Sequence, residues 1–110
     1  MSVSDDYLAY LQDLMPWVSD LRSKRMFGGV GLYSDALFFA IVVDNILYLK
    51  ADAKNAALYG DGGGEQFSHQ RQGKTVKMGF WSVPADIQEE SETLRAWVES
   101  ALDAARRAKK

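Results

Sequence analysis

Few side chains in this sequence could do covalent or metal chemistry. It contains one histidine, His69, and no cysteine, which removes disulfides, thiolate nucleophiles and cysteine-based zinc sites. The immediate neighbours of His69 supply no carboxylate, so a metal site or a nucleophilic triad would need distant groups brought to it by folding. We expect a solvent-facing strand histidine, no metal, no cofactor and no enzymatic activity.

Basic and aromatic residues are interleaved in the second half of the sequence. The basic residues fall on adjacent predicted strands or in their turn and are Lys50, Arg71, Lys74 and Lys77. Tyr48, Phe67 and Trp81 lie near them in the sequence. Many proteins bind nucleic acid through cationic side chains placed beside aromatic rings. Direct nucleic-acid binding through these four residues is our alternative hypothesis. The net charge of -2 and the ordinary use of lysine on sheet surfaces argue against it.

The most distinctive segment runs from Arg25 to Tyr33 and has three glycines in four positions between large apolar residues. It lacks the spacing and the Lys-Ser/Thr pair of a Walker motif, and no helix is predicted after it. We therefore favour a bend or bulge in a strand over a phosphate-binding loop. A small-ligand or enzymatic pocket beside Gly28 and Gly29 is our least favoured hypothesis.

Aromatic, basic and glycine positions in this segment and in later strands are our candidates for contact with a protein partner. They are Arg25, Phe27, Gly28, Gly29, Gly31, Tyr33, Tyr48, Lys50 and Trp81. A second copy of the same chain could fill the same role, so a homodimer is a further expectation.

Composition and charge limit the class of protein. With 110 residues, 47% of them hydrophobic, the chain supports one core, and we expect a single domain over residues 1–110. The acidic N-terminus does not resemble a signal peptide, and the longest apolar run, Ala36 to Val43, is too short to span a bilayer as a helix. We expect a cytoplasmic protein that does not enter a membrane.

The first half of the sequence predicts a helix followed by strands. Apolar residues at three- and four-residue spacing follow Ser4 and favour a helix that ends near Met15, before Pro16, or a kinked helix that continues to Leu21. From Leu21 the period becomes two, which predicts a strand bent at the glycines. Two further strands follow turns at Ser34-Asp35 and Asp44-Asn45 and complete a three-stranded meander. The strand from Ala36 to Val43 has no polar residue, so we expect it to be central and covered on both faces.

The second half predicts a short helix, a hairpin and a last helix. Residues 52–59 suit a helix capped by Asp52, and a glycine-rich segment separates it from a hairpin whose turn lies around Gly73. Asp86 or Ser91 can cap the last helix, whose apolar stripe is Leu94, Trp97, Val98, Ala101 and Leu102. The order α-β-β-β-α-β-β-α predicts a two-layer α+β fold with one five-stranded antiparallel sheet.

The segment from Arg25 to Tyr33, Arg-Met-Phe-Gly-Gly-Val-Gly-Leu-Tyr, resembles the N-terminal domain of the TfoX/Sxy family of bacterial competence regulators. The resemblance continues through residues 47–52 and 81–85 and covers nearly the whole chain. It implies a single antiparallel sheet similar to that of type III secretion chaperones, and it carries over no catalytic residues. Full-length members act in switching on competence genes with the cyclic-AMP receptor protein and carry a second, helical domain, so the resemblance implies a stand-alone N-terminal domain here.

Taken together, the residues and the resemblance lead to one expectation about function. We expect a small cytoplasmic domain that takes part in transcription regulation through a protein partner.

Overall fold

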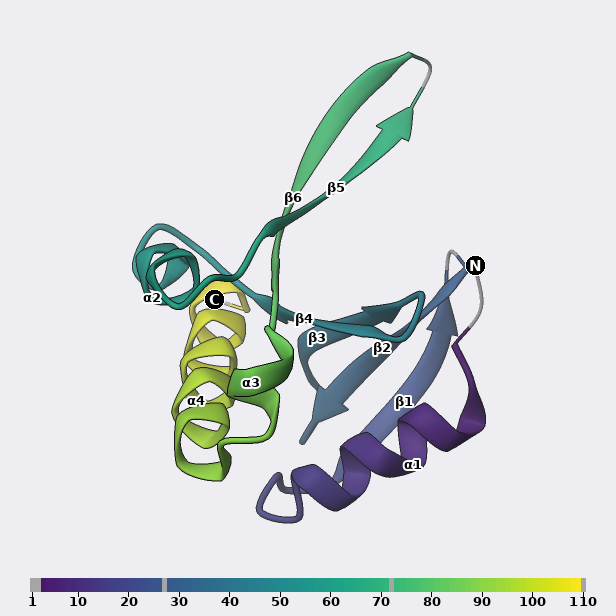
Figure 1. Cartoon of the computed structure of the whole chain (residues 1–110), viewed down its shortest axis with the longest axis vertical. Helices are drawn as coiled ribbons and strands as arrows, with labels where there is room; N and C mark the ends of the chain where they lie inside the picture. The colour runs from purple at the N-terminus through teal and green to yellow at the C-terminus, as the bar shows by residue number, and fades with distance from the viewer. Residues whose placement is uncertain (1–2, 27, 72, 110) are drawn as a thin grey trace.

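The computed structural model describes residues 3–26, 28–71 and 73–109. These residues form four helices and one six-stranded antiparallel sheet (Figure 1). The elements are α1 (Asp5–Leu14), β1 (Leu21–Met26), β2 (Gly29–Ser34), β3 (Leu37–Val43), β4 (Ile46–Lys50), α2 (Ala56–Asp61), β5 (Gln66–Arg71), β6 (Lys74–Ser82), α3 (Ala85–Gln88) and α4 (Ser91–Ala108). The strand order is β1-β2-β3-β4-β6-β5. The α+β class with a single antiparallel sheet is confirmed.

The sheet has one strand more than predicted because the chain turns at Gly28. β1 and β2 pair from Met26 opposite Gly29 to Leu21 opposite Ser34, so the segment predicted as one bent strand is a hairpin. Gly28 has φ +78°, the left-handed conformation that glycine adopts readily in hairpin turns. The meander therefore contains four strands instead of three.

The other two turns of the meander also contain residues with positive φ. Asp44 and Asn45 have φ values of +53° and +58°, which confirms the predicted two-residue turn between β3 and β4. The turn between β2 and β3 is one residue later than predicted, since Asp35 and Ala36 are the residues with positive φ. Aspartate and asparagine tolerate this conformation better than most residues.

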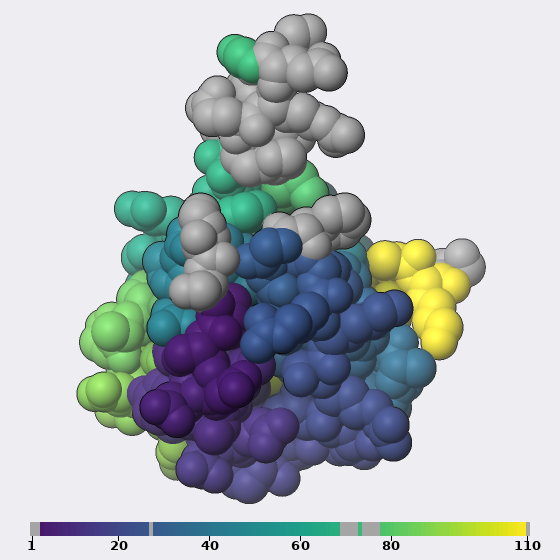
Figure 2. Space-filling view, turned by 90° about the vertical axis from the view of Figure 1, so that its right-hand side faces the viewer, coloured from purple at the N-terminus to yellow at the C-terminus, as the bar shows by residue number. Residues whose placement is uncertain are grey.

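The helices gather on one side of the sheet (Figure 1), and α1 lies against the strands at its β1 edge (Figure 2). The hydroxyl of Ser4 caps α1 by accepting the N–H of Tyr7, and the helix ends at Leu14, just before Pro16, as predicted. α4 packs on β3 and β4, and the five residues of its predicted stripe are all buried. In the described part of the chain no helix is long and apolar enough to cross a membrane.

The helix boundaries after the meander differ from the prediction. α2 begins at Ala56, and Asp52 lies in the turn before it, where its carboxylate accepts the N–H of Lys54 at 2.9 Å. Ser91 is the first residue of α4 and not its cap, because the short helix α3 brings the chain into α4 through Glu90. Local capping chemistry was present in the sequence, but the packing of α2 and α3 decided where each helix starts.

A buried polar cluster holds the end of β4 against α2 and α4. The amide nitrogen of Asn55 donates to the carbonyl of Lys50 at 3.2 Å and to the carbonyl of Ser100 at 3.1 Å. The hydroxyl of Tyr59, which is fully buried, lies 3.0 Å from the same Lys50 carbonyl and 3.3 Å from that of Trp97. Burial raises the pKa of Tyr59, so the hydroxyl stays protonated and can donate. This cluster fixes the backbone of Lys50 at the end of β4.

Arg107 closes the same region by a bidentate ion pair with Asp52, with N–O distances of 2.6 and 2.9 Å. Hydrogen bonding from Arg107 is the main cause that lowers the pKa of Asp52 from 3.8 to about 2. A carboxyl group whose pKa is lower in the folded than in the unfolded chain stabilises the fold above its unfolded pKa and loses that contribution as the pH falls. The stabilising contribution of the Asp52 carboxylate is therefore lost as the pH falls from 3.8 to about 2.

We predict that Asp52→Asn destabilises the protein near neutral pH and that the difference from the unmodified chain shrinks as the pH falls through this window. Urea unfolding of both proteins at a series of pH values measures it. Replacement of Asp103, whose pair with Arg106 is exposed, is the matched control and should show a smaller difference. A difference for Asp52→Asn that stays constant down to pH 2 would contradict the assignment.

Candidate interaction face

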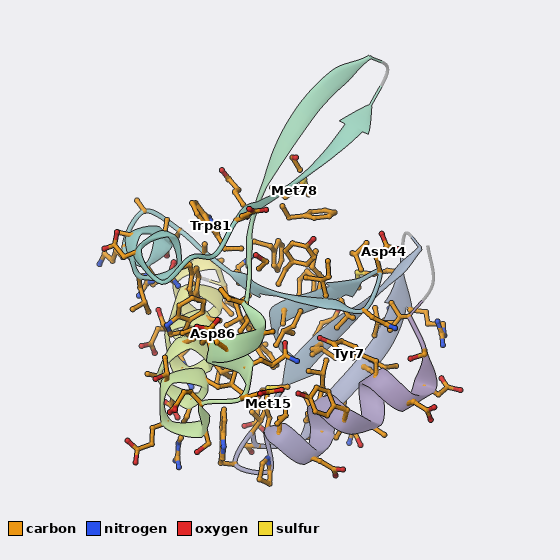
Figure 3. The ribbon with its side chains drawn as sticks, in the orientation of Figure 1. Tyr7, Met15, Asp44, Met78, Trp81 and Asp86 are labelled. Carbon is orange, nitrogen blue, oxygen red and sulfur yellow. The ribbon has the colours of Figure 1, made fainter. Side chains whose placement is uncertain are left out.

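One face of the sheet is not covered by a helix, and we call it the uncovered face. Its apolar members are Met26, Tyr33, Phe38, Ile41, Val43, Ile46, Tyr48, Phe67, Met78 and Phe80. Opposite residues of paired strands share a face, so Lys24, Gly31, Ile41, Tyr48 and Ser82 form one row across five strands. In Figure 3, Tyr7 and Met15 lie among the helices, whereas Asp44 and Met78 lie toward the other side of the sheet.

The neighbouring row shows the contrast between the two faces. Val30, Val42 and Leu47 lie opposite one another on the helix side and are at most 1% exposed. Ile41 and Tyr48, which alternate with them, are only half-buried. The prediction that the strand from Ala36 to Val43 is covered on both faces is therefore wrong. In the described part of the chain, no helix covers its second face, whose residues contact neighbouring side chains of the sheet.

Lys50 lies at the end of β4 within a group of aromatic rings. Its ammonium nitrogen is 5.2 Å from the ring centre of Phe80 and 5.9 Å from that of Phe38. Phe38 also stacks on Tyr33 at 5.1 Å and contacts Phe80 at 5.5 Å. Among the described residues no carboxylate pairs with Lys50. The ammonium is held by ring faces, which attract a cation but do not neutralise it.

A pocket of about 440 Å³ opens on the same face beyond the other end of β4. Tyr48 and Phe67 line it with their rings edge to face at 4.8 Å, and Asp44 and Glu65 contribute carboxylates. Burial raises the pKa of Tyr48, and the negative charges of Asp44 and Glu65 raise it further. The pocket therefore brings aromatic and acidic residues together at this end of the face.

Two other predicted contact residues, Arg25 and Trp81, lie on the helix side of the sheet. Arg25 is on the helix side of β1, 3.4 Å from Asp5 of α1, and Phe27 lies outside the described residues. Trp81 lies opposite Leu49 and packs beside Gly60 of α2 (Figure 3). Of the nine candidates, Tyr33, Tyr48 and Lys50 bring side chains to the uncovered face.

The candidate glycines are explained by the packing and backbone conformation of the β1–β2 hairpin. A Cβ atom on Gly29 would lie 2.6 Å from the carbonyl oxygen of Val42, and one on Gly31 would meet Met26 and Phe38. A Cβ atom on Gly28 would have no atom within 4 Å, so only the φ of this residue requires glycine. These residues shape the hairpin and let Met26 and Phe38 lie flat on the sheet.

The strand register places Lys50 apart from the other three basic residues of the nucleic-acid hypothesis. Arg71 pairs with Lys74 next to the hairpin turn, and Lys77 pairs with Ser68. Lys50 pairs with Phe80, three residues further along β6 than Lys77, which is roughly 10 Å along the strand. The hairpin of β5 and β6 projects away from the rest of the molecule (Figure 1), and the side chains of Arg71, Lys74 and Lys77 are outside the described residues. Nucleic-acid binding stays a prediction.

Sequence reasoning missed several residues of the uncovered face. Phe38, Phe80, Asp44 and Glu65 were not candidates. A signal was present in Ile46 to Lys50, where Leu47 and Leu49 alternate with Ile46, Tyr48 and Lys50, which indicates one covered and one open face. His69, whose side chain is outside the described residues, stays untested, and in the described parts of the chain no three carboxylate or imidazole groups gather as metal ligands would.

Comparison with known proteins identifies similar sequences. A model of the TfoX N-terminal domain matches residues 9–105. The chain is also similar to a DNA transformation protein, TfoX1, of Aliivibrio fischeri, with 26% identity over 85 residues. That alignment covers 77% of this chain and 41% of the relative, so the chain spans less than half of the relative's length.

Proposed function

Because the chain belongs to the TfoX N-terminal domain family, we propose that it is a regulatory domain that acts in the cytoplasm by binding another protein chain, without catalysing a reaction. The observation that carries this proposal is the uncovered face. An antiparallel sheet with one solvated face normally alternates apolar residues toward the core with polar residues toward water. Here the residues of both faces are largely apolar, and those of the uncovered face are mostly half-buried, with Ile46 exposed. Neighbouring apolar side chains that stay partly open to solvent are typical of protein-binding sites.

The process that the domain regulates is a second part of the proposal. The similar protein of Aliivibrio fischeri is a DNA transformation protein, which favours transformation as the process. This chain aligns with only 41% of that relative. The proposal therefore concerns what this domain contributes to transformation and not the activity of the whole relative.

Site-specific photo-crosslinking in living bacteria tests the protein contact. A photoreactive phenylalanine analogue replaces Tyr33, which lies on the uncovered face, or Tyr10, an exposed residue of α1 that serves as the matched control. We expect a protein crosslink from position 33 and a much weaker one from position 10. Equal crosslinking at both positions, or none at position 33, would contradict the proposal.

A further inference from the structure

We propose that the uncovered face binds an extended segment of a partner protein that carries a carboxylate two residues away from a large apolar side chain. The inference rests on the proposed function, because it names the chemistry of the partner at the same face. Its basis is a shallow pocket at one end of this face, where two lysines lie beside aromatic rings.

The pocket lies where the uncovered face meets the C-terminal end of α4, and its volume is about 260 Å³. In Figure 1 this end of α4, coloured yellow, lies beside the point where β4 leaves the sheet. Lys50 and Lys109 line the pocket together with Phe38 and further apolar residues from β3, the turn before it and α4. None of its described lining residues is acidic. The pocket is therefore positively charged and otherwise apolar, which suits a carboxylate attached to an apolar segment.

The ammonium group of Lys50 is held in position by the rest of the fold. It lies 5.2 Å from the ring centre of Phe80 and 5.9 Å from that of Phe38, and its backbone is fixed by the buried polar cluster. Among the residues that the structure describes, no carboxylate forms an ion pair with Lys50 or Lys109. An ordered lysine loses less side-chain entropy on binding than a mobile surface lysine, so a carboxylate gains more from the contact.

The rings beside Lys50 define the apolar part of the partner segment. Phe38 stacks on Tyr33 with ring centres 5.1 Å apart, and both rings are half-buried. In an extended segment, side chains two residues apart point to the same side and lie roughly 7 Å from each other. This is close to the 5.9 Å between the Lys50 ammonium and the ring centre of Phe38. A segment whose carboxylate meets the two lysines therefore places its next side chain on the same side against Phe38 and Tyr33.

The same rings favour a peptide over a nucleic acid at this pocket. A nucleobase binds by stacking on the flat face of an aromatic ring. Phe38 is already stacked on Tyr33 and lies under Lys50, and Phe80 lies under the same ammonium and is only 8% exposed. An aliphatic side chain needs apolar contact but no free ring face, so it suits this group better.

Selection from a display library of random short peptides tests the chemistry of the partner. The baits are the unmodified chain and the double variant Lys50→Met/Lys109→Gln, in which methionine keeps an unbranched apolar side chain beside the rings and removes the charge. Lys54→Gln/Arg95→Gln is the matched control, because it removes two positive charges at exposed positions away from the pocket. Thermal unfolding checks that each bait is folded.

We expect the unmodified chain and the control to enrich peptides with an acidic residue two positions from leucine, isoleucine or phenylalanine. The pocket variant should not enrich them. Titration followed by nuclear magnetic resonance then compares one selected peptide with its form in which an amide replaces the carboxylate. Loss of the carboxylate should weaken binding to the unmodified chain at least about tenfold. The same change should weaken binding to the pocket variant less than about twofold, because the carboxylate and the lysines act as a pair.

Three results would overturn the inference. They are a selection without acidic peptides, equal enrichment by the pocket variant, and an amide peptide that binds as tightly as the acidic one. Self-association of the unmodified chain that Lys50→Met/Lys109→Gln abolishes would overturn it in favour of a second copy at the pocket. Salt-dependent binding of single-stranded DNA that the same variant abolishes would overturn it in favour of the nucleic-acid hypothesis.

The photo-crosslinking experiment separates failure of this inference from failure of the proposed function. A protein crosslink from position 33 that persists unchanged in Lys50→Met/Lys109→Gln would overturn the acidic segment and leave the proposed function standing. Absence of that crosslink in the unmodified chain would count against the proposed function itself.

Discussion

Replacing Gly29 by alanine is expected to lower the free energy of unfolding by about 3 kcal/mol. The added Cβ would lie 2.6 Å from the carbonyl oxygen of Val42 and 3.1 Å from a methyl carbon of Val43. Both neighbours belong to β3, in the middle of the sheet, so the backbone cannot move away without breaking its pairing with β2 or β4. Urea unfolding followed by far-ultraviolet circular dichroism measures the loss.

Gly28→Asn is the matched control for this prediction. An added Cβ on Gly28 would have no atom within 4 Å, and asparagine tolerates the φ of +78° at this position. We expect a change of less than about 1 kcal/mol, because only a modest conformational preference is lost. Equal losses at the two positions would contradict contact with β3 as the cause of the larger loss at position 29. A Gly29→Ala protein of normal stability that no longer crosslinks from position 33 would instead make Gly29 a contact residue.

Asn55→Ala is expected to lower the free energy of unfolding by about 3 kcal/mol, the sum of several buried hydrogen bonds. Asn55 is 5% exposed, and its amide nitrogen donates to the carbonyls of Lys50 and Ser100. Its amide oxygen accepts the N–H of Asp52 at 2.8 Å. Alanine leaves these buried groups without that partner and frees the end of β4 from α2 and α4. Equilibrium unfolding in urea gives the loss directly.

Two further variants separate the hydrogen bonds of Asn55 from its bulk. Asn55→Asp keeps the acceptor for Asp52 and removes the donors, so it should also destabilise the fold. Gln12→Ala removes an exposed amide from α1 and should change stability by less than about 0.5 kcal/mol. An Asn55→Ala protein as stable as the unmodified chain would show that the cluster does not hold β4.

Much of the fold was predictable because its signals are local. The stripe from Leu94 to Leu102 fixed the buried face of α4, Pro16 fixed the end of α1, and Asp44-Asn45 fixed the β3–β4 turn. The sixth strand was missed because a glycine in a strand fits either a bulge or a turn by sequence alone. Gly28 becomes a turn only through the pairing of Met26 with Gly29.

The candidate site was predictable in part. Tyr33, Tyr48 and Lys50 were candidates, since aromatic and basic residues on strands are natural contact residues. Phe38 was not a candidate, because an all-apolar strand does not say how many of its faces a helix covers. Glu65 is distant from Asp44 in sequence, and only the pairing of β4 with β6 brings both to one pocket.

By itself, the sequence determined the class of this protein, its family and the positions of most helices and turns, because these depend on residue type and on spacing along the chain. Only the tertiary structure decided that the long helices of the described residues, α1 and α4, pack on one face and leave aromatic side chains and Lys50 on the other. That division depends on which strands pair and on which side of the sheet the chain crosses. Neither is encoded in any single segment.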